Sequence, residues 1–130
     1  MLLDLATPIL VVDDEPAMVK LMTGLIRAAG FEDVDSTNEA QDALQMIAKK
    51  EYGVILSDLQ MQPTSGLQLV RTIRAASSVH QPRIILTTAS RSHGDVIAAK
   101  HVGVDAYLLK PFTPAQLKDK LREVANLPTR

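Results

Sequence analysis

The sequence predicts an α/β domain in which a parallel sheet of five strands is covered by five helices. Five short apolar runs alternate along the chain with segments whose apolar residues recur at helical spacing. Residues 54–56, near the middle of the chain, are apolar at every position, as expected for a strand buried on both faces. A regular alternation of strands and helices produces a doubly wound parallel sheet with right-handed crossovers and helices on both faces.

The composition is typical of one globular domain. The chain has 130 residues, 46% hydrophobic and 22% charged, with a net charge of -1, so we expect residues 1–130 to form a single domain. This charge balance does not favour a nucleic acid or a membrane surface as a partner. The absence of cysteine excludes a disulfide framework and allows a cytoplasmic location. Residues 1–5 lack the basic leader of a signal peptide, and no apolar run is long enough to span a bilayer.

The first strand is expected at Ile9–Val12 and is followed directly by two acids, Asp13 and Asp14. A helix opens near Pro16, which suits the first turn, and the acids lie near the positive end of its dipole. Gly30 ends this helix. Its inner face consists of Met18, Leu21, Met22, Leu25 and Ile26.

The second strand is short and weak, at residues 33–36. Asn38 is expected to cap the next helix, with Gln41 returning the hydrogen bond. Lys49 and Lys50 suit the negative end of that helix. Its buried stripe consists of Ala40, Ala43, Leu44 and Ile47.

The third strand ends at Asp58 and is followed by a loop that contains Pro63 and Gly66. The fourth strand is expected at Arg83–Thr88 and the fifth at Ala106–Leu109. The inner faces of the third and fifth helices consist of Leu69, Val70 and Ile73, and of Leu117, Leu121 and Val124.

The last two helices carry signals at their ends. Ser92 and Asp95 form an expected capping pair for a short helix rich in alanine, which Gly103 ends. Thr113 and Gln116 form a capping box for the last helix, with proline at its first position.

Five polar side chains stand at the ends of these strands: Asp13, Asp14, Asp58, Thr88 and Lys110. Taken singly, each has an ordinary explanation as a helix cap, a turn or a solvated loop. Because ligands of open α/β sheets bind outside the carboxyl ends of the strands, we expect all five to lie together there. Their convergence indicates one site rather than five separate structural roles.

The charges and atom types at this edge predict a magnesium site. Three neighbouring carboxylates repel one another, and each raises the proton affinity of the others. A divalent cation together with Lys110 neutralises them, and a donor set made only of oxygen favours a hard ion such as Mg²⁺. Such a site suits phosphoryl transfer, with Asp58 as the nucleophile that becomes an aspartyl phosphate.

Four motifs resemble the receiver domains of bacterial two-component response regulators, of the stand-alone chemotaxis-regulator (CheY-like) type. They are VVDDE at residues 11–15, SDLQM at residues 57–61 with Gly66, TA at residues 88–89 and YLLKPF at residues 107–112. The resemblance covers about residues 7–126 and implies a flavodoxin-like fold with strand order 2-1-3-4-5. It also implies that the protein is not an enzyme, except that it catalyses its own phosphorylation and dephosphorylation.

The resemblance implies a role for each residue of the site. Asp58 would accept a phosphoryl group from the phosphohistidine of a sensor histidine kinase or a histidine phosphotransfer protein. Asp14 would bind Mg²⁺ directly, Asp13 mainly through water, and Gln60 through its backbone carbonyl. Lys110 would pair with the phosphoryl group.

The resemblance also implies a switch. Thr88 would move to hydrogen-bond the phosphoryl group, and Tyr107 would swing inward behind it. The face formed by the fourth helix, fifth strand and fifth helix would then bind a downstream target protein. The peptide bond between Lys110 and Pro111 is expected to be cis. We expect a monomer, or a weak dimer that depends on phosphorylation, without direct contact to nucleic acid.

Two positions depart from the family pattern. Pro63 stands one residue later than usual because Gln62 intervenes, while Gly66 keeps its usual distance from Asp58. The family pattern therefore does not predict the backbone conformation of this loop or any partner contact there. Ala106 stands where a large subfamily of DNA-binding regulators has an acid used in its dimer interface, which argues against that mode of output.

The same residues do not fit two other classes of protein that this fold could serve. A haloacid-dehalogenase-type phosphatase needs a second acid two residues after its nucleophile, where this chain has Gln60. A flavodoxin-type electron carrier needs a loop rich in hydroxyls and glycine after the first strand, where this chain has acids. Two alternatives stay open: a degenerate receiver that acts as a phosphorylation-independent interaction module, and the receiver part of a longer regulator.

Overall fold

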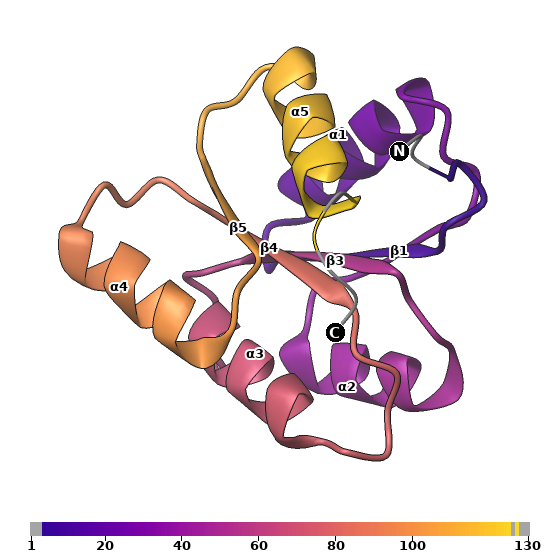
Figure 1. Ribbon diagram of the computed structural model, residues 1–130. Helices are drawn as coiled ribbons and strands as arrows, with labels where there is room; N and C mark the ends of the chain where they lie inside the picture. Colours follow the sequence, from indigo (N-terminus) through magenta and orange to yellow (C-terminus); the bar gives the residue numbers. More distant parts are fainter. Residues whose placement is uncertain (1–3, 126, 128–130) are drawn as a thin grey trace.

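A five-stranded parallel sheet forms the centre of the protein and lies between two layers of helices (Figure 1). The structure is a computed structural model that describes residues 4–125 and 127, so the expectation about residues 1–5 falls mostly outside the described residues. The strands are β1 (Ile9–Val12), β2 (Val34–Thr37), β3 (Val54–Asp58), β4 (Arg83–Thr88) and β5 (Ala106–Leu109). Their order is β2-β1-β3-β4-β5, which confirms the predicted fold class and strand order.

The five helices divide between the two faces of the sheet. They are α1 (Pro16–Ala28), α2 (Ala40–Lys49), α3 (Gly66–Ala75), α4 (His93–Val102) and α5 (Pro114–Ala125). Helices α1 and α5 cover one face, and α2, α3 and α4 cover the other (Figure 1). Each crossover from one strand to the next therefore passes over a face of the sheet, as parallel strands require.

Alternate residues of the central strands enter two separate cores. Leu10 and Ile55 pack with residues of α2 and α3, whereas Val11 and Leu56 pack with residues of α1 and α5. Every residue of β1 and β3 is buried, because helices cover both faces there. This explains why these strands are continuous apolar runs in the sequence rather than alternating ones.

The register of the strands brings their carboxyl ends to one level. In the pairing of β3 with β4, Asp58 lies opposite Thr87, and in the pairing of β4 with β5, Thr88 lies opposite Leu109. Asp13 directly follows β1, which pairs with β3 on its other side. The register therefore places the predicted site residues along one edge of the sheet.

Two helices begin with complete capping boxes. At α5, the Thr113 hydroxyl accepts from the Gln116 amide at 3.1 Å, and the Gln116 side chain accepts from the Thr113 amide at 2.8 Å, as predicted. Ser65 and Gln68 form the same pair of bonds at the start of α3, which the sequence analysis did not predict. The start of α3 is therefore as firmly defined as the start of α5.

The predicted cap of α2 is wrong. Strand β2 lies one residue later than expected, at Val34–Thr37, and the N-cap of α2 is Glu39, with no side-chain hydrogen bond. The Thr37 hydroxyl accepts the Glu39 amide at 3.3 Å and closes the turn before the helix. Asn38 therefore stands one position too early to cap the helix, and the predicted return hydrogen bond from Gln41 does not form.

Of two further details of the helices, one differs from the prediction and one confirms it. Leu21 is 53% exposed, whereas Met22 and Ile26 are fully buried. Each residue of a helix turns by about 100° relative to the one before it, so Leu21 lies on the outer side of Met22. At α4, the Ser92 hydroxyl accepts the Asp95 amide as predicted, but the Asp95 carboxylate does not return the bond and accepts instead from another serine, described below.

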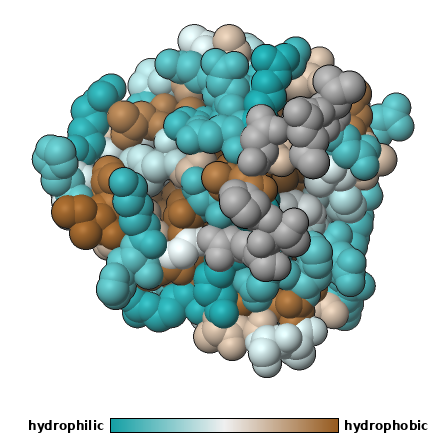
Figure 2. All heavy atoms as spheres, viewed as in Figure 1, coloured by the Kyte–Doolittle hydropathy of each residue, from teal (hydrophilic) through white to brown (hydrophobic). Residues whose placement is uncertain are grey.

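The surface in Figure 2 is mainly hydrophilic, with an apolar patch over α4 at the left. Ile97 of α4 contributes to the exposed apolar surface, since 66% of it is accessible. Among the helices within residues 4–125, none combines the length and the apolar character that crossing a membrane requires.

Candidate functional site

Three carboxylates meet at the carboxyl edge of the sheet, as the sequence predicted. Asp13 is fully buried behind the end of β1, Asp58 ends β3 and is 6% exposed, and Asp14 is partly buried. One oxygen atom from each of these side chains lies within 4.8 Å of the other two. The arrangement is an acidic pocket of a size that one metal ion can bridge.

Lys110 supplies the positive charge of the pocket. It follows β5, and its Nζ lies 3.0 Å from Asp13 Oδ2 and 3.5 Å from Asp58 Oδ1. The Lys110 side chain is only 14% exposed, so solvent screens both interactions only weakly. The structure thus brings the predicted lysine to the predicted carboxylates, with its shorter contact to Asp13 rather than to Asp58.

Backbone amides of the surrounding loops also point at these carboxylates. Asp13 Oδ1 accepts from the Glu15 amide at 2.9 Å, and Asp14 Oδ2 accepts from the Gln62 amide at 3.2 Å. Asp58 Oδ1 accepts a longer bond of 3.4 Å from the Gln60 amide. The role of the Gln60 carbonyl as a metal ligand stays a prediction.

The loop after β3 is held close to Asp58 by Gly66. Its amide donates to the Leu59 carbonyl at 2.8 Å, and a Cβ atom at this position would lie only 2.2 Å from the Asp58 carbonyl oxygen. Only glycine allows α3 to begin this close to the backbone of the acceptor strand. The peptide bond before Pro63 is cis, as is the predicted cis bond between Lys110 and Pro111.

Burial raises the pKa of the Asp58 carboxyl above its ordinary value of 3.8. The Lys110 charge opposes this rise in pKa, and the negative charge of Asp13 adds to it. Repulsion between neighbouring carboxylates was expected to raise their proton affinity. At Asp58 that repulsion is present, but desolvation is the larger cause of the raised pKa.

The two predicted switch residues lie side by side behind the acidic pocket. Thr88 is fully buried, and its Oγ1 accepts the amide of Ser90 at 3.1 Å. The Tyr107 hydroxyl donates to the Ser90 carbonyl at 3.3 Å. Burial raises the pKa of Tyr107, and the negative charge of Asp95 raises it further.

Sequence reasoning missed Ser90, although it contacts both of these residues. Its position two residues after Thr88 was the available signal, but a serine in a loop is ordinary and does not point to a role. The contacts that distinguish it come from β5 and α4 and are visible only in the folded chain.

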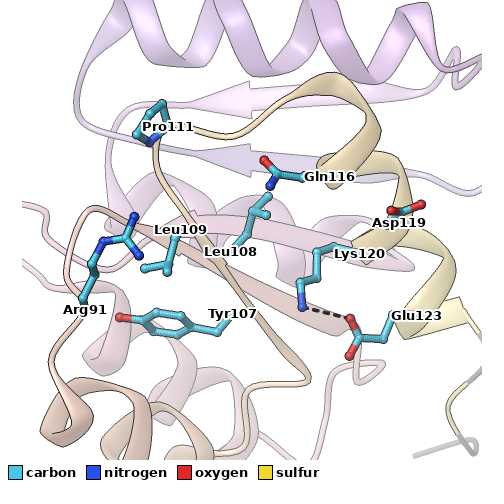
Figure 3. Close-up of a pocket in the computed structure, with 9 residues that line it drawn as sticks. All are labelled: Arg91, Tyr107, Leu108, Leu109, Pro111, Gln116, Asp119, Lys120 and Glu123. Atoms are coloured by element: carbon cyan, nitrogen blue, oxygen red, sulfur yellow. Dashed lines mark ion pairs between the residues drawn. The ribbon is translucent and has the colours of Figure 1, made fainter.

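A hollow of about 510 Å³ lies beside the pocket, between β5, α5 and the loop before α4 (Figure 3). In this view the side chains of Arg91 and Tyr107 lie along one side of the hollow, and Gln116 and Lys120 of α5 lie on the other. Lys120 pairs with Glu123 at 3.1 Å on its rim. The hollow therefore lies on the predicted output face and not over the carboxylates.

Comparison with known proteins identifies the relatives of this chain. Residues 9–122 match the sequence model of a family described as "Response regulator receiver domain". The chain is 32% identical over 116 residues to the chemotaxis protein CheY-3 of Vibrio cholerae, and this covers 89% of each chain. It is 34% identical over 117 residues to a chemotaxis protein CheY homolog of Campylobacter jejuni, which covers 89% of this chain and 90% of that protein.

Solved structures share the fold over nearly the whole chain. The chemotaxis response regulator CheY4 of Vibrio cholerae superposes with a TM-score of 0.84 at 28% identity, over 92% of this chain and 98% of that one. The receiver domain of a sensor histidine kinase from Pseudomonas aeruginosa superposes with a TM-score of 0.82 at 28% identity, over 93% of this chain and 99% of that one. That structure holds a magnesium ion coordinated in its active-site cleft.

Proposed function

The chain belongs to the response regulator receiver family, and from that membership we propose that it is a signalling protein switched by phosphorylation of Asp58. Members of this family are not conventional enzymes, and neither is this chain. We propose that residues 1–130 act as a single receiver domain, with a core at about residues 7–126.

The observation that carries the proposal is the acidic pocket with its lysine. Oxygen atoms of Asp13, Asp14 and Asp58 lie within 4.8 Å of one another, and Lys110 Nζ lies 3.0 Å and 3.5 Å from two of these side chains. A set of hard oxygen donors with a net negative charge fits Mg²⁺. We infer that these three side chains, with the Gln60 carbonyl, hold the ion, which when bound would neutralise phosphoryl oxygens.

Asp58 is the nucleophile of the proposed reaction. One of its carboxylate oxygens bonds to the phosphorus of a phosphohistidine, the bond from phosphorus to the imidazole nitrogen breaks, and the imidazole leaves with the electron pair and takes up a proton. The carboxylate must be ionised to react, and Lys110 favours this form against the effect of burial. Lys110 then pairs with the phosphoryl group on Asp58.

The output follows from the residues behind the pocket. The Thr88 hydroxyl turns toward a phosphoryl oxygen, Tyr107 moves inward behind it, and the face made by α4, β5 and α5 changes its surface. The hollow of about 510 Å³ on this face is a concave surface for a downstream target protein (Figure 3). A shift of a bistable element from mostly off to mostly on takes about 5 kcal/mol of differential interaction.

The proposed partners are a sensor histidine kinase or histidine phosphotransfer protein and one downstream target. The charge balance supports neither a nucleic acid nor a membrane as a direct partner. We propose a cytoplasmic location, in keeping with the absence of cysteine, and a monomer or a weak dimer that forms on phosphorylation.

The test is phosphorylation by acetyl phosphate with and without Mg²⁺, followed by intact mass spectrometry. We expect the mass of one phosphoryl group to be added only with Mg²⁺, and the product to be labile to base. Asp58→Asn should abolish the addition, whereas the matched control Asp119→Asn, an exposed acid of α5, should not.

Labelling that persists in Asp58→Asn would refute the assignment of the acceptor. A wild-type protein that takes up no phosphoryl group with Mg²⁺ would favour the alternative of a degenerate receiver. The presence of all three carboxylates together with Lys110 supports the active receiver over that alternative.

A further inference from the structure

A cluster of hydrogen bonds at the start of α4 joins Thr88 to this helix. Ser90 uses all three of its polar groups there. Its amide donates to Thr88 Oγ1 at 3.1 Å, its carbonyl accepts from the Tyr107 hydroxyl at 3.3 Å, and its own hydroxyl donates to Asp95 Oδ2 at 2.5 Å. Ser90 therefore contacts both predicted switch residues and the first turn of α4.

The body of α4 is held loosely against the sheet. Among its residues, His93–Val102, only Ala99 is fully buried, and Ile97 is 66% exposed. A hollow of about 110 Å³ lies between α4 and β5, lined in part by Val96, Ala99 and Tyr107. The helix has few large side chains that fix its position, and it has space to shift into.

The C-terminal end of α4 is anchored more firmly. Arg74 of α3 donates from its Nε to the Gly103 carbonyl at 3.0 Å and from its Nη2 to Asp105 Oδ2 at 2.9 Å. The side chain of Asp105 is only 5% exposed and also accepts the Ile84 amide at 2.8 Å. This end of the helix is bonded to both α3 and β4, so we expect any movement of α4 to be concentrated at the opposite end.

We propose that Ser90 and Asp95 form a latch that transmits the movement of Thr88 to the N-terminal end of α4, while the helix pivots near Gly103. The latch rests on the proposed function, because it needs a phosphoryl group on Asp58 to move Thr88. When the Thr88 hydroxyl turns toward that group, it gives up the bond from the Ser90 amide. The loop at Ser90 is then released from Thr88 and shifts. Because the Ser90 hydroxyl is bonded to the Asp95 carboxylate, the first turn of α4 shifts with it.

Ser90 is a positioning residue in this scheme, since it touches neither the acceptor nor the metal ligands. Its bond to Asp95 involves a carboxylate, and such charge-assisted bonds are shorter and stronger than neutral ones. Removing the Ser90 hydroxyl should therefore change the equilibrium between the two positions of α4 by about tenfold, which corresponds to about 1.4 kcal/mol.

The test is NMR of the backbone amides of the full chain with Mg²⁺, with and without beryllofluoride as a mimic of the phosphoryl group. In the wild type we expect shifts at Asp58 and Thr88 and also in the first turn of α4. Ser90→Ala should keep the shifts at Asp58 and lose most of those in α4. In a double-mutant cycle, Ser90→Ala with Asp95→Ala should lose no more than either single variant.

The matched control is Ser92→Ala, which removes the cap of the same turn but leaves the bonds from Thr88 through Ser90 to Asp95 in place. It should keep the α4 response. An undiminished α4 response in Ser90→Ala would overturn the latch, and so would an equal loss in Ser92→Ala, because simple fraying of the helix would then explain both. A wild type with no response at Asp58 would overturn the proposed function and the latch with it.

Discussion

Replacing Gly66 by alanine should destabilise the protein and disturb Asp58, because this glycine lies directly against the backbone of the acceptor strand. A Cβ atom at this position would lie 2.2 Å from the Asp58 carbonyl oxygen and 2.9 Å from the Leu59 Cα atom. Both are backbone atoms, so no side-chain rotation relieves the overlap. Either the start of α3 or the end of β3 has to move.

The expected magnitude follows from this overlap. Overpacking of a well-packed site costs about 1–3 kcal/mol, and the better helix propensity of alanine returns at most about 1 kcal/mol. Gly66 is the first residue of α3, where the propensity gain is smaller than in a helix interior. We expect a net loss of about 2 kcal/mol, which lowers the melting temperature of a domain of this size by roughly 6–10 °C. A displacement of Asp58 by about 1 Å would slow its phosphorylation by up to about 100-fold.

Gly24→Ala is the matched control, because a Cβ atom at Gly24 meets nothing within 4 Å. It lies inside α1, so alanine should stabilise the protein by about 0.5–1 kcal/mol. Urea unfolding gives the stability of both variants, and mass spectrometry gives the initial rate of phosphorylation by acetyl phosphate. A Gly66→Ala protein as stable as the wild type would refute the reasoning, and an unchanged phosphorylation rate would show that α3, rather than Asp58, gives way.

Three other perturbations probe the pocket and the switch. Without metal, Asp14→Ala should raise the melting temperature, because it relieves repulsion between the carboxylates. It should also abolish the stabilisation by Mg²⁺, which is about 2.7 kcal/mol when the Mg²⁺ concentration is 100 times the dissociation constant. A variant that melts at a lower temperature and is still stabilised by Mg²⁺ would contradict this. Because burial raises the pKa of Asp58 above 3.8, the folded state binds this proton more tightly than the unfolded chain does, and the resulting stability is complete below pH 3.8 and is lost as the pH rises through the raised pKa. Asp58→Asn should therefore be more stable than the metal-free wild type at neutral pH, and urea midpoints should show this advantage shrinking as the pH falls. Thr88→Ala should still be phosphorylated on Asp58 but should no longer couple phosphorylation to binding of the target, and normal binding of the target by the phosphorylated variant would contradict the switch.

The sequence by itself determined the elements of the fold and the membership of the site. Short continuous apolar runs and apolar residues at a period of 3.6 reflect local geometry, so they marked the buried strand at residues 54–56 and the inner face of α5 without knowledge of the fold. The alternation of strands and helices then implied one sheet edge, and Asp13, Asp58 and Lys110 could be assigned to it. The capping box of Thr113 and Gln116 was predictable for the same reason, since its partners are three residues apart.

Local sequence patterns gave the wrong burial for one residue of α1 and the wrong cap for α2. Leu21 fits the apolar spacing of α1 but lies on its exposed side, because spacing alone does not distinguish the centre of a buried stripe from its margin. Asn38 is a good capping residue by type. The pairing of β2 with β1 extends the strand to Thr37, however, and moves the start of α2 beyond its reach.

Only the tertiary structure decided which groups touch within the site. Lys110 lies closer to Asp13 than to Asp58, although 97 residues separate the first pair in the chain. The contact of Gly66 with the Asp58 carbonyl and the bonds of Ser90 to Tyr107 depend on how α3 and β5 pack against neighbouring strands. Distances of a few tenths of an ångström between such groups are set by the register of the sheet and the packing of whole helices, and no local period of the sequence records them.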